Sequence, residues 1–260
     1  MTYLDEIIKN KEREIAILKI EKPIASLTKS DLFNKKCNSM RDSILRSNNG
    51  IISEFKRKSP SKGFINEKAD LESVVAQYQQ SGAAAVSVLA DKKFFAAQDD
   101  DHSKAARILS IPLFYKEFII DEYQIFEAKS KGADAILLIA AILDQKKCEE
   151  LAQTAKFLGM ETVLEIHCKD EISLLNANIN MAGINNRNLR TFETNIENSI
   201  QLSKEISDNF VKISESGISS PETVNILKNN GFKGFLIGEN FMKTENPGLA
   251  LQTFIKGIKK

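Results

Sequence analysis

The chemically most suggestive residues of this 260-residue chain stand in the segment Ile51–Gly63, which reads IISEFKRKSPSKG. Side chains alternate along a strand, so Ile52, Glu54 and Lys56 would share one side of it. If that side faces inward, a carboxylate and an ammonium line an interior, where burial costs free energy unless the charges are paired or used. This placement favours a chemical site. The alternative is an edge strand that leaves both charges in solvent.

Polar residues also follow the other apolar runs, and Lys116 and Glu165 are the natural acid–base candidates among them. A lysine has a reference pKa of ~10.4 and is protonated at neutral pH. A nearby carboxylate would keep it charged, and a carbonyl substrate could accept its proton. The alternative for each residue is a solvated charge at a strand end. Together the residues at the expected strand ends predict an anion-receptive pocket: Glu54, Lys56, Asp91, Lys116, Glu165, Asn185, Arg187, Glu215, Ser216, Gly238 and Glu239.

A repeated unit predicts the elements that position these residues. Gly82, Gly132, Gly159 and Gly231 each follow an amphipathic segment and precede a short apolar run. A glycine in this place is typical of a helix C-terminus that needs a positive φ, and the run is typical of a parallel strand covered on both faces. The expected strands are 51–55, 85–89, 111–115, 135–139, 162–165, 181–185, 210–214 and 234–237.

The segments between these strands predict helices, among them 121–131, 144–158 and one that has Pro221 in its first turn. Eight βα units in residues 48–260 predict an α/β protein with a (β/α)₈ (TIM) barrel as catalytic domain. A doubly wound open sheet is the alternative, but the first βα turn lacks its usual GxGxxG fingerprint.

Residues 1–47 precede the barrel and are expected to form an N-terminal helical extension packed on it. An apolar stripe runs from Leu4 to Leu18, and a second helix is expected from about Asp31 to Arg46. The alternative for this segment is a dimerisation arm.

The glycines near the last two expected strands predict a phosphate site. Gly217 follows the seventh strand and Gly238 follows the eighth. Without a side chain, such residues let backbone N–H groups approach a ligand, and loops after strands 7 and 8 form the common phosphate site of this barrel. The alternative is that both are ordinary turn glycines.

Composition excludes several classes of function. Lys+Arg number 36 and Asp+Glu 35, so the net charge of +1 gives no support for a nucleic-acid or membrane partner. Three isolated cysteines and the lack of an apolar signal region predict a reduced, cytoplasmic protein. We expect no metal: Asp99–His102 is interpreted as a solvated loop, since consecutive residues seldom converge on one ion. His167 and Cys168 are interpreted as loop residues too, because adjacent residues seldom form a nucleophile pair.

The stretches EFKRKSPSKG, KEFIIDEYQI and GINNRNL are long enough to be specific. With them, the chain closely resembles the indole-3-glycerol phosphate synthase family in order along nearly its whole length. The resembling segments are Ile52–Gly63, Ser87–Phe95, Lys116–Glu127, Gly183–Phe192, Ser214–Ile218 and Leu236–Gly238.

The resemblance implies ring closure of a carboxyphenylamino deoxyribulose phosphate with loss of carbon dioxide and water, in tryptophan biosynthesis and without cofactor. It implies that Lys116 is the general acid, that Lys56 engages the substrate carboxylate and assists later proton transfer, and that Glu165 transfers protons beside Glu54 and Asn185. A phosphorylated small molecule is the implied partner of a monomer or weak homo-oligomer. The remaining implied substrate contacts are Ser59, Phe95, Phe118, Arg187, Leu189, Glu215, Ser216, Gly217, Gly238 and Glu239.

One departure from the family pattern is a turn, Ala96-Ala97-Gln98, where members commonly carry Gly-Gly-Ser or similar. Alanine lacks glycine's freedom at positive φ, so this loop is expected to sit differently against the substrate. Two other functions remain open. A non-catalytic paralogue could have lost turnover through this loop and kept phosphate affinity. Another phosphosugar barrel enzyme, such as phosphoribosylanthranilate isomerase, would require a Cys/Asp acid–base pair rather than two lysines.

Overall fold

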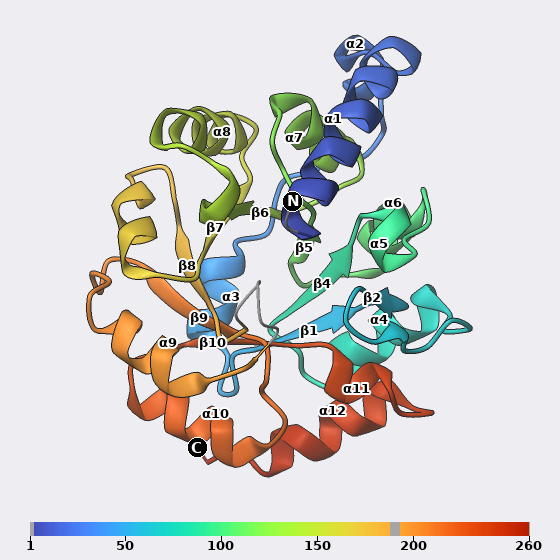
Figure 1. Ribbon diagram of the computed structural model, residues 1–260. Helices are drawn as coiled ribbons and strands as arrows, with labels where there is room; N and C mark the ends of the chain where they lie inside the picture. Colours follow the sequence, from blue (N-terminus) through green and yellow to red (C-terminus); the bar gives the residue numbers. More distant parts are fainter. Residues whose placement is uncertain (1–2, 188–192, 260) are drawn as a thin grey trace.

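The computed structural model describes residues 3–187 and 193–259. Within these residues eight parallel strands close into a barrel that helices surround (Figure 1), which confirms the predicted fold class. The first strand pairs with the last, Ile51 opposite Phe235, and so has a neighbour on each side. The edge-strand alternative for this segment is therefore wrong. The strands are β1 (Ile51–Phe55), β4 (Ala85–Leu89), β5 (Leu113–Lys116), β6 (Ala135–Ile139), β7 (Glu161–Ile166), β8 (Met181–Asn185), β9 (Val211–Glu215) and β10 (Gly234–Ile237).

Five strands have the predicted bounds, and β5 shows why others differ. It begins at Leu113 rather than at Ile111 because Pro112 has no N–H to donate to a neighbouring strand. The N–H of Leu113 instead donates to Asp134 at 2.8 Å. This shift carries Lys116 into the strand itself, as its last residue.

Capped helices return the chain from one strand to the next. Asp70, Asp121, Asp144 and Ser220 each accept a backbone N–H in the first turn of a helix. The connection from β7 to β8 is different, since it contains a 3₁₀ helix, η2 (Lys169–Leu174), in place of the expected α-helix. The surrounding helices are α4 (Leu71–Gln80), α6 (Asp101–Ile108), α7 (Glu122–Ser130), α8 (Gln145–Phe157), α9 (Ile196–Ser203), α10 (Pro221–Asn229) and α12 (Pro247–Lys256).

Short elements follow several strands at their carboxyl ends. The loop after β1 folds into a small hairpin, which brings its charged residues back over the end of the barrel. These elements are β2 (Lys58–Ser59), β3 (Gly63–Phe64), α5 (Lys92–Phe95), η1 (Ala140–Ile142) and α11 (Glu239–Met242).

The segment before the barrel contains α1 (Tyr3–Glu21), α2 (Ile24–Leu27) and α3 (Met40–Arg46). The expectation of a helix from Asp31 to Arg46 was wrong in its first half. The carboxylate of Asp134 accepts from the Lys35 ammonium at 3.2 Å and from the Asn38 N–H at 2.9 Å, so the chain runs across the barrel end instead of coiling.

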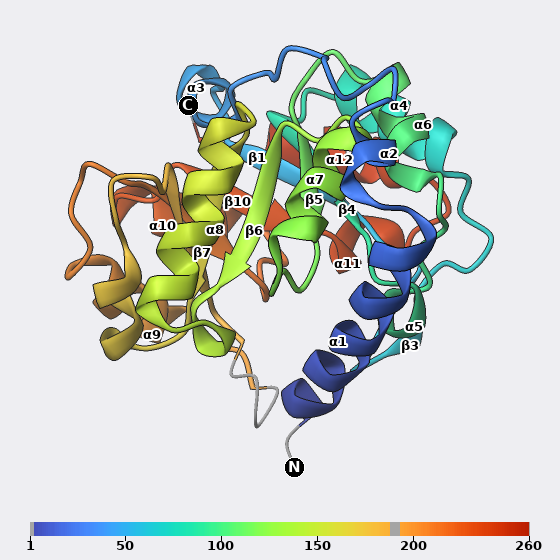
Figure 2. The same ribbon diagram turned by 90° about the horizontal axis from the view of Figure 1, so that it is seen from above.

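The helix α3 closes one end of the barrel. Its Met40 and Ile44 are fully buried in one apolar cluster with inward-facing strand residues such as Ile52, Phe114 and Met181. Figure 2 shows α3 at one end of the barrel, and α5 with the start of α1 at the opposite end. None of the helices in the described residues is both long and apolar enough to cross a membrane.

Candidate active site

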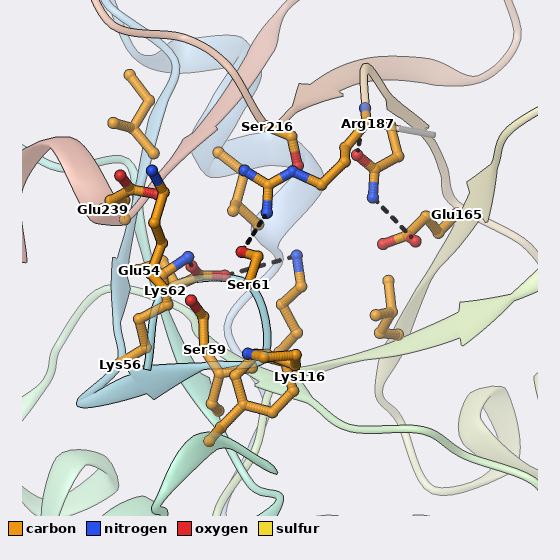
Figure 3. Close-up of a pocket in the computed structure, with 18 of the residues that line it drawn as sticks. Glu54, Lys56, Ser59, Ser61, Lys62, Lys116, Glu165, Arg187, Ser216 and Glu239 are labelled. Atoms are coloured by element: carbon orange, nitrogen blue, oxygen red, sulfur yellow. Dashed lines mark hydrogen bonds and ion pairs between the residues drawn. The ribbon is translucent and has the colours of Figure 1, made fainter. Parts of the chain in front are cut away.

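A cavity of about 390 Å³ opens at the carboxyl ends of the strands, opposite α3 (Figure 3). Strand alternation explains its charge, because the inward position two residues after a buried apolar or glycine residue is polar on several strands. Lys116 follows Phe114, and Glu215 follows Ile213. The structure brings together nearly all of the site residues expected from sequence: Glu54, Lys56, Ser59, Phe95, Lys116, Phe118, Glu165, Asn185, Arg187, Ser216, Gly217, Gly238 and Glu239 line the cavity.

Lys116 is held at the base of this cavity between two carboxylates. Its ammonium donates to Glu215 at 2.6 Å and lies 3.5 Å from Glu54. Lys56 lies on the other side of Glu54, at 2.7 Å. Glu54 and Glu215 are almost completely buried, whereas both ammonium groups keep a small exposed area toward the cavity. The result is a short row of alternating charges with its cations facing the substrate space.

These pairings set the ionisation of the row. Burial lowers the pKa of Lys116, but Glu215 and Glu54 more than compensate and raise it above its usual value. Burial raises the pKa of Glu54, but Lys56 and Lys116 bring it below its usual value. The pKa of Glu215 is raised by burial and by the neighbouring carboxylates. Lys116 is therefore a protonated acid at neutral pH.

Glu215, which was expected to contact the substrate, is not among the residues that line the cavity, and its carboxylate is the nearest partner of Lys116. Its second oxygen, Oε1, has no hydrogen-bond partner within residues 3–187 and 193–259. That oxygen occupies the space that a side chain at Gly183 would need, since an added Cβ would lie 2.5 Å from it. A glycine on β8 thus makes room for a carboxylate from β9.

Glu165 faces the row from β7. Its Oε1 accepts from the Asn185 amide at 3.2 Å and lies 3.1 Å from Nε2 of His167. His167 lies in the loop after β7, as expected, but its contact with Glu165 was not predicted. The signal was present in the sequence: residues 165 and 167 are two apart, so they share a side of the chain as it leaves the strand.

The loops after β1, β9 and β10 form the polar wall expected to hold phosphate. Ser216 and Gly217 both have positive φ, 68° and 69°. The amide of Asn186 donates to the Ser216 carbonyl at 2.7 Å and helps to hold this turn. Ser59 Oγ, from the hairpin, is buried with no hydrogen-bond partner among the described residues. An unpaired hydroxyl beside a cationic loop is typical of a site that a ligand completes.

Gly238 lines the cavity, and its contact with Glu54 gives a further reason for a glycine at this position. Its φ is −121°, so its backbone does not require glycine. A Cβ there would instead collide with the carboxylate of Glu54. The residue is thus small because the charged row passes beside it.

Two aromatic rings form the opposite wall of the cavity. Phe95 and Phe118 lie with their ring centroids 6.2 Å apart, and both line the cavity. Leu189, the third residue expected at this wall, lies outside the described residues. Ala96 ends α5 with φ of 57°, so this alanine adopts the left-handed conformation that glycine would favour.

A buried ionic cluster behind this wall was not predicted. Lys11 of α1 lies 2.7 Å from Asp91 and 3.0 Å from Glu117. Asp91 caps α5, which carries Phe95, and Glu117 stands between Lys116 and Phe118. Helix α1 therefore supports the aromatic wall from outside and adds Leu4 and Ile7 to the cavity lining.

The fold and this site define a class. A (β/α)₈ barrel with a lysine acid held between carboxylates, a carboxylate on a facing strand and a polar wall after β9 and β10 is typical of enzymes that act on phosphorylated small molecules. Among the described residues, no group of three or more His, Cys, Asp or Glu side chains is placed to hold a metal ion.

Comparison with known proteins identifies the family. The family model of indole-3-glycerol phosphate synthase matches residues 4–254. The indole-3-glycerol phosphate synthase of Bacteroides thetaiotaomicron is 48% identical over 98% of both chains, and that of Carboxydothermus hydrogenoformans is 37% identical over 97% of this chain and 99% of the relative. The chain belongs to the indole-3-glycerol phosphate synthase family, whose members are carboxy-lyases of tryptophan biosynthesis.

Solved structures with the same fold are more distant in sequence. A tryptophan synthase subunit alpha from Legionella pneumophila superposes with a TM-score of 0.61 at 11% identity, covering 84% of this chain and 96% of that one. A 3-hexulose-6-phosphate synthase from Salmonella typhimurium gives 0.62 at 12% identity, covering 80% and 98%. At these identities the likeness concerns the barrel alone.

Proposed function

We propose that this chain converts 1-(2-carboxyphenylamino)-1-deoxyribulose 5-phosphate into indole-3-glycerol phosphate with Lys116 as general acid, Lys56 as the carboxylate contact and Glu165 as proton acceptor. The observation that carries the proposal is the position of Lys116, a protonated ammonium that faces the cavity while Glu215 and Glu54 hold it from behind. The roles of Lys56 and Glu165 follow from their positions, since both residues line the same cavity as Lys116.

Ring closure requires acid at the ketone of the substrate. The aromatic carbon that bears the carboxylate attacks the ketone carbon, a carbon–carbon bond forms, and the ketone oxygen takes the proton of Lys116. The substrate carboxylate lies against Lys56, whose partner Glu54 is 2.7 Å away. The carboxylate then leaves as carbon dioxide, and the electrons of the broken bond restore the aromatic ring.

Dehydration completes the indole. The new hydroxyl leaves as water after it receives a second proton from a lysine of the row, and the adjacent carbon loses a proton to Glu165. The amide of Asn185 keeps one oxygen of Glu165 directed at the cavity. Proton transfer and charge placement supply this chemistry, each general acid–base step contributing roughly 10²–10⁴-fold.

We propose that the phosphate binds between the hairpin after β1 and the turns after β9 and β10. Ser59, with its unpaired hydroxyl, and the Ser216–Gly217 turn support this end. Phe95 and Phe118 would then flank the aromatic ring at the other end. We further infer a cytosolic enzyme that acts as a monomer or weak homo-oligomer, without nucleic-acid partners.

The test is the growth of indole fluorescence when the substrate is added to purified protein. The chain contains no tryptophan, so the product signal stands against a low background. We expect a steady rise that Lys116→Ala lowers by roughly 10²–10⁴-fold. Lys104→Ala is the control, because Lys104 is exposed on α6 and its ammonium lies 2.8 Å from Asp100, the N-cap residue of the same helix.

Two outcomes would contradict the proposal. Full activity of a folded Lys116→Ala variant would remove Lys116 from its role. Binding of the substrate without any fluorescence rise would favour the non-catalytic paralogue, and the Ala96–Gln98 turn would then be the first segment to revert to glycine.

A further inference from the structure

His167 contacts Glu165 but is not among the residues that line the cavity. We propose that His167 is a positioning residue that keeps Glu165 ionised and directed at the substrate, and that Glu171 holds the imidazole from its other side. The proposal rests on the role proposed above for Glu165, and it adds two residues to the machinery.

The imidazole of His167 lies between the carboxylates of Glu165 and Glu171. Nε2 of His167 lies 3.1 Å from Oε1 of Glu165, and Nδ1 lies 3.6 Å from Oε2 of Glu171. The same Oε2 of Glu171 accepts the backbone N–H of His167 at 2.6 Å, so η2 fixes the residue as well as its ring. The contact with Glu165 has the distance of an ion pair but not the direction of a ring hydrogen bond.

This arrangement favours a charged imidazole. Neither ring nitrogen has a hydrogen-bond partner among the described residues, but each lies within ion-pair distance of a carboxylate, and two nearby carboxylates stabilise a positive charge. The exposed fraction of the His167 side chain is 13%, so solvent only weakly screens its interactions with the two carboxylates. Burial lowers the pKa of His167, but Glu165 and Glu171 outweigh burial and raise it to about 10.

Glu165 has few other charged neighbours. Lys116 faces it from β5 and Glu215 from β9, while Asn185 of β8 contributes an uncharged amide. Because Lys116 already lies between Glu215 and Glu54, its charge is shared among several carboxylates. Burial raises the pKa of Glu165, but His167 and then Lys116 bring it below its usual value. Without His167, a buried carboxylate beside Glu215 would retain a proton more readily.

The decisive variant is His167→Gln, which keeps a hydrogen-bond donor of similar size and removes the charge. We expect kcat to fall by about 10-fold or more with KM much less affected. We also expect the acid limb of the kcat profile to move up by roughly 1–3 pH units, because an opposite charge at this distance shifts a carboxyl pKa by that amount. A folded His167→Gln variant with the pH profile of the parent would overturn the proposal.

Two further variants make the result specific. Lys169→Gln removes a cation from the same connection, but its side chain is 72% exposed and pairs with Glu205, so we expect no change. Glu165→Gln tests the underlying role. If it stays active, the assignment of Glu165 itself fails. If it is inactive while His167→Gln keeps the parent profile, only the assignment of His167 fails.

A measurement on the unaltered protein does not depend on any variant folding. The chain has two histidines, and the other one, His102, is fully buried with Nε2 3.0 Å from the Val88 carbonyl; burial lowers its pKa to about 3. Neither imidazole should therefore titrate between pH 5 and 8 when followed by NMR. An imidazole signal with a midpoint near the ordinary value of ~6.5 would overturn the proposal.

Discussion

The two ends of the barrel are built from the same strands and differ in what points inward. At the end closed by α3, Met40 and Ile44 complete an apolar layer with residues such as Ile52 and Phe114. At the open end, the next inward positions on those two strands are Glu54 and Lys116. On these strands, inward positions two residues apart thus belong to a packed apolar layer and to a row of buried charges.

The closed end of the barrel contributes mainly to stability, and the open end contributes mainly to function. Burying apolar surface at the closed end contributes directly to the free energy of unfolding. Burying charges at the open end costs free energy that their mutual pairing only partly returns. Substitutions at the closed end should therefore change the free energy of unfolding without changing catalytic activity. Substitutions at the open end should change catalytic activity with little effect on the free energy of unfolding.

The largest expected effect follows removal of the central ion pair at the open end. The double variant Lys116→Met/Glu215→Gln should lose activity by roughly 10³-fold or more, because the acid is gone. Its free energy of unfolding should equal or exceed that of the parent, since replacing a buried ion pair by neutral groups is often neutral or stabilising. Fluorescence assay and urea unfolding measure the two quantities, and a loss of several kcal/mol would contradict the comparison.

A truncation at the closed end should have the opposite signature. Met40→Ala removes most of a fully buried side chain and should lower the free energy of unfolding by about 2–5 kcal/mol. Activity per folded molecule should stay within a factor of two of the parent at about 20 °C, because Met40 belongs to α3, which closes the end of the barrel opposite the charged residues. A fall in kcat without a fall in stability would show that the two ends are coupled.

Two glycines of β10 and its following turn offer a matched pair. An added Cβ at Gly234 would lie 2.8 Å from Ile213 near the closed end, and one at Gly238 would collide with Glu54 at the open end. Overpacking costs about 1–3 kcal/mol, so Gly234→Ala should lower stability alone. Gly238→Ala should lower kcat by about 10-fold or more by displacing the carboxylate. Thermal unfolding measures the stability of both variants, and the fluorescence assay measures their activity. Equal losses of activity in the two variants would contradict the difference expected between the two ends.

The smallest expected effect concerns the rim of the open end. Ala96 has φ of 57°, which costs a non-glycine residue about 1–2 kcal/mol. Ala96→Gly should raise the free energy of unfolding by about 0.5–1 kcal/mol, after the greater entropy of glycine in the unfolded chain is subtracted. Calorimetry would detect the gain as a higher Tm. A lower Tm would mean that the alanine methyl group packs favourably in this turn.

Much of this architecture follows from local sequence. The strands that carry the site have nearly continuous apolar runs with a glycine before them, and this pattern located Ala85–Leu89 and Ala135–Ile139 without error. The expected site residues converge because parallel strands must bring their carboxyl ends to one face. Both inferences depend only on periodicity and topology.

The errors have a common physical cause, which is contact between segments far apart in the chain. Lys35 and Asn38 are drawn into an extended path by Asp134, about 100 residues later. Lys11 is buried by Asp91 and Glu117, and Gly238 is required by Glu54. No local pattern records such partners. The contact of His167 with Glu165 is the exception, since alternation along the chain could have indicated it.

The pairing of β1 with β10 has a consequence for how the protein is made. During synthesis β1 leaves the ribosome long before its second neighbour β10, and its free edge must wait for the last strand of the barrel. Lys56 follows β1 and Gly238 follows β10, so a nascent chain that has not yet reached Gly238 cannot contain the complete pocket. Such long-range pairing folds slowly and leaves strand edges open to wrong partners in the meantime. The nascent chain should therefore depend on chaperone protection until its final strand has emerged.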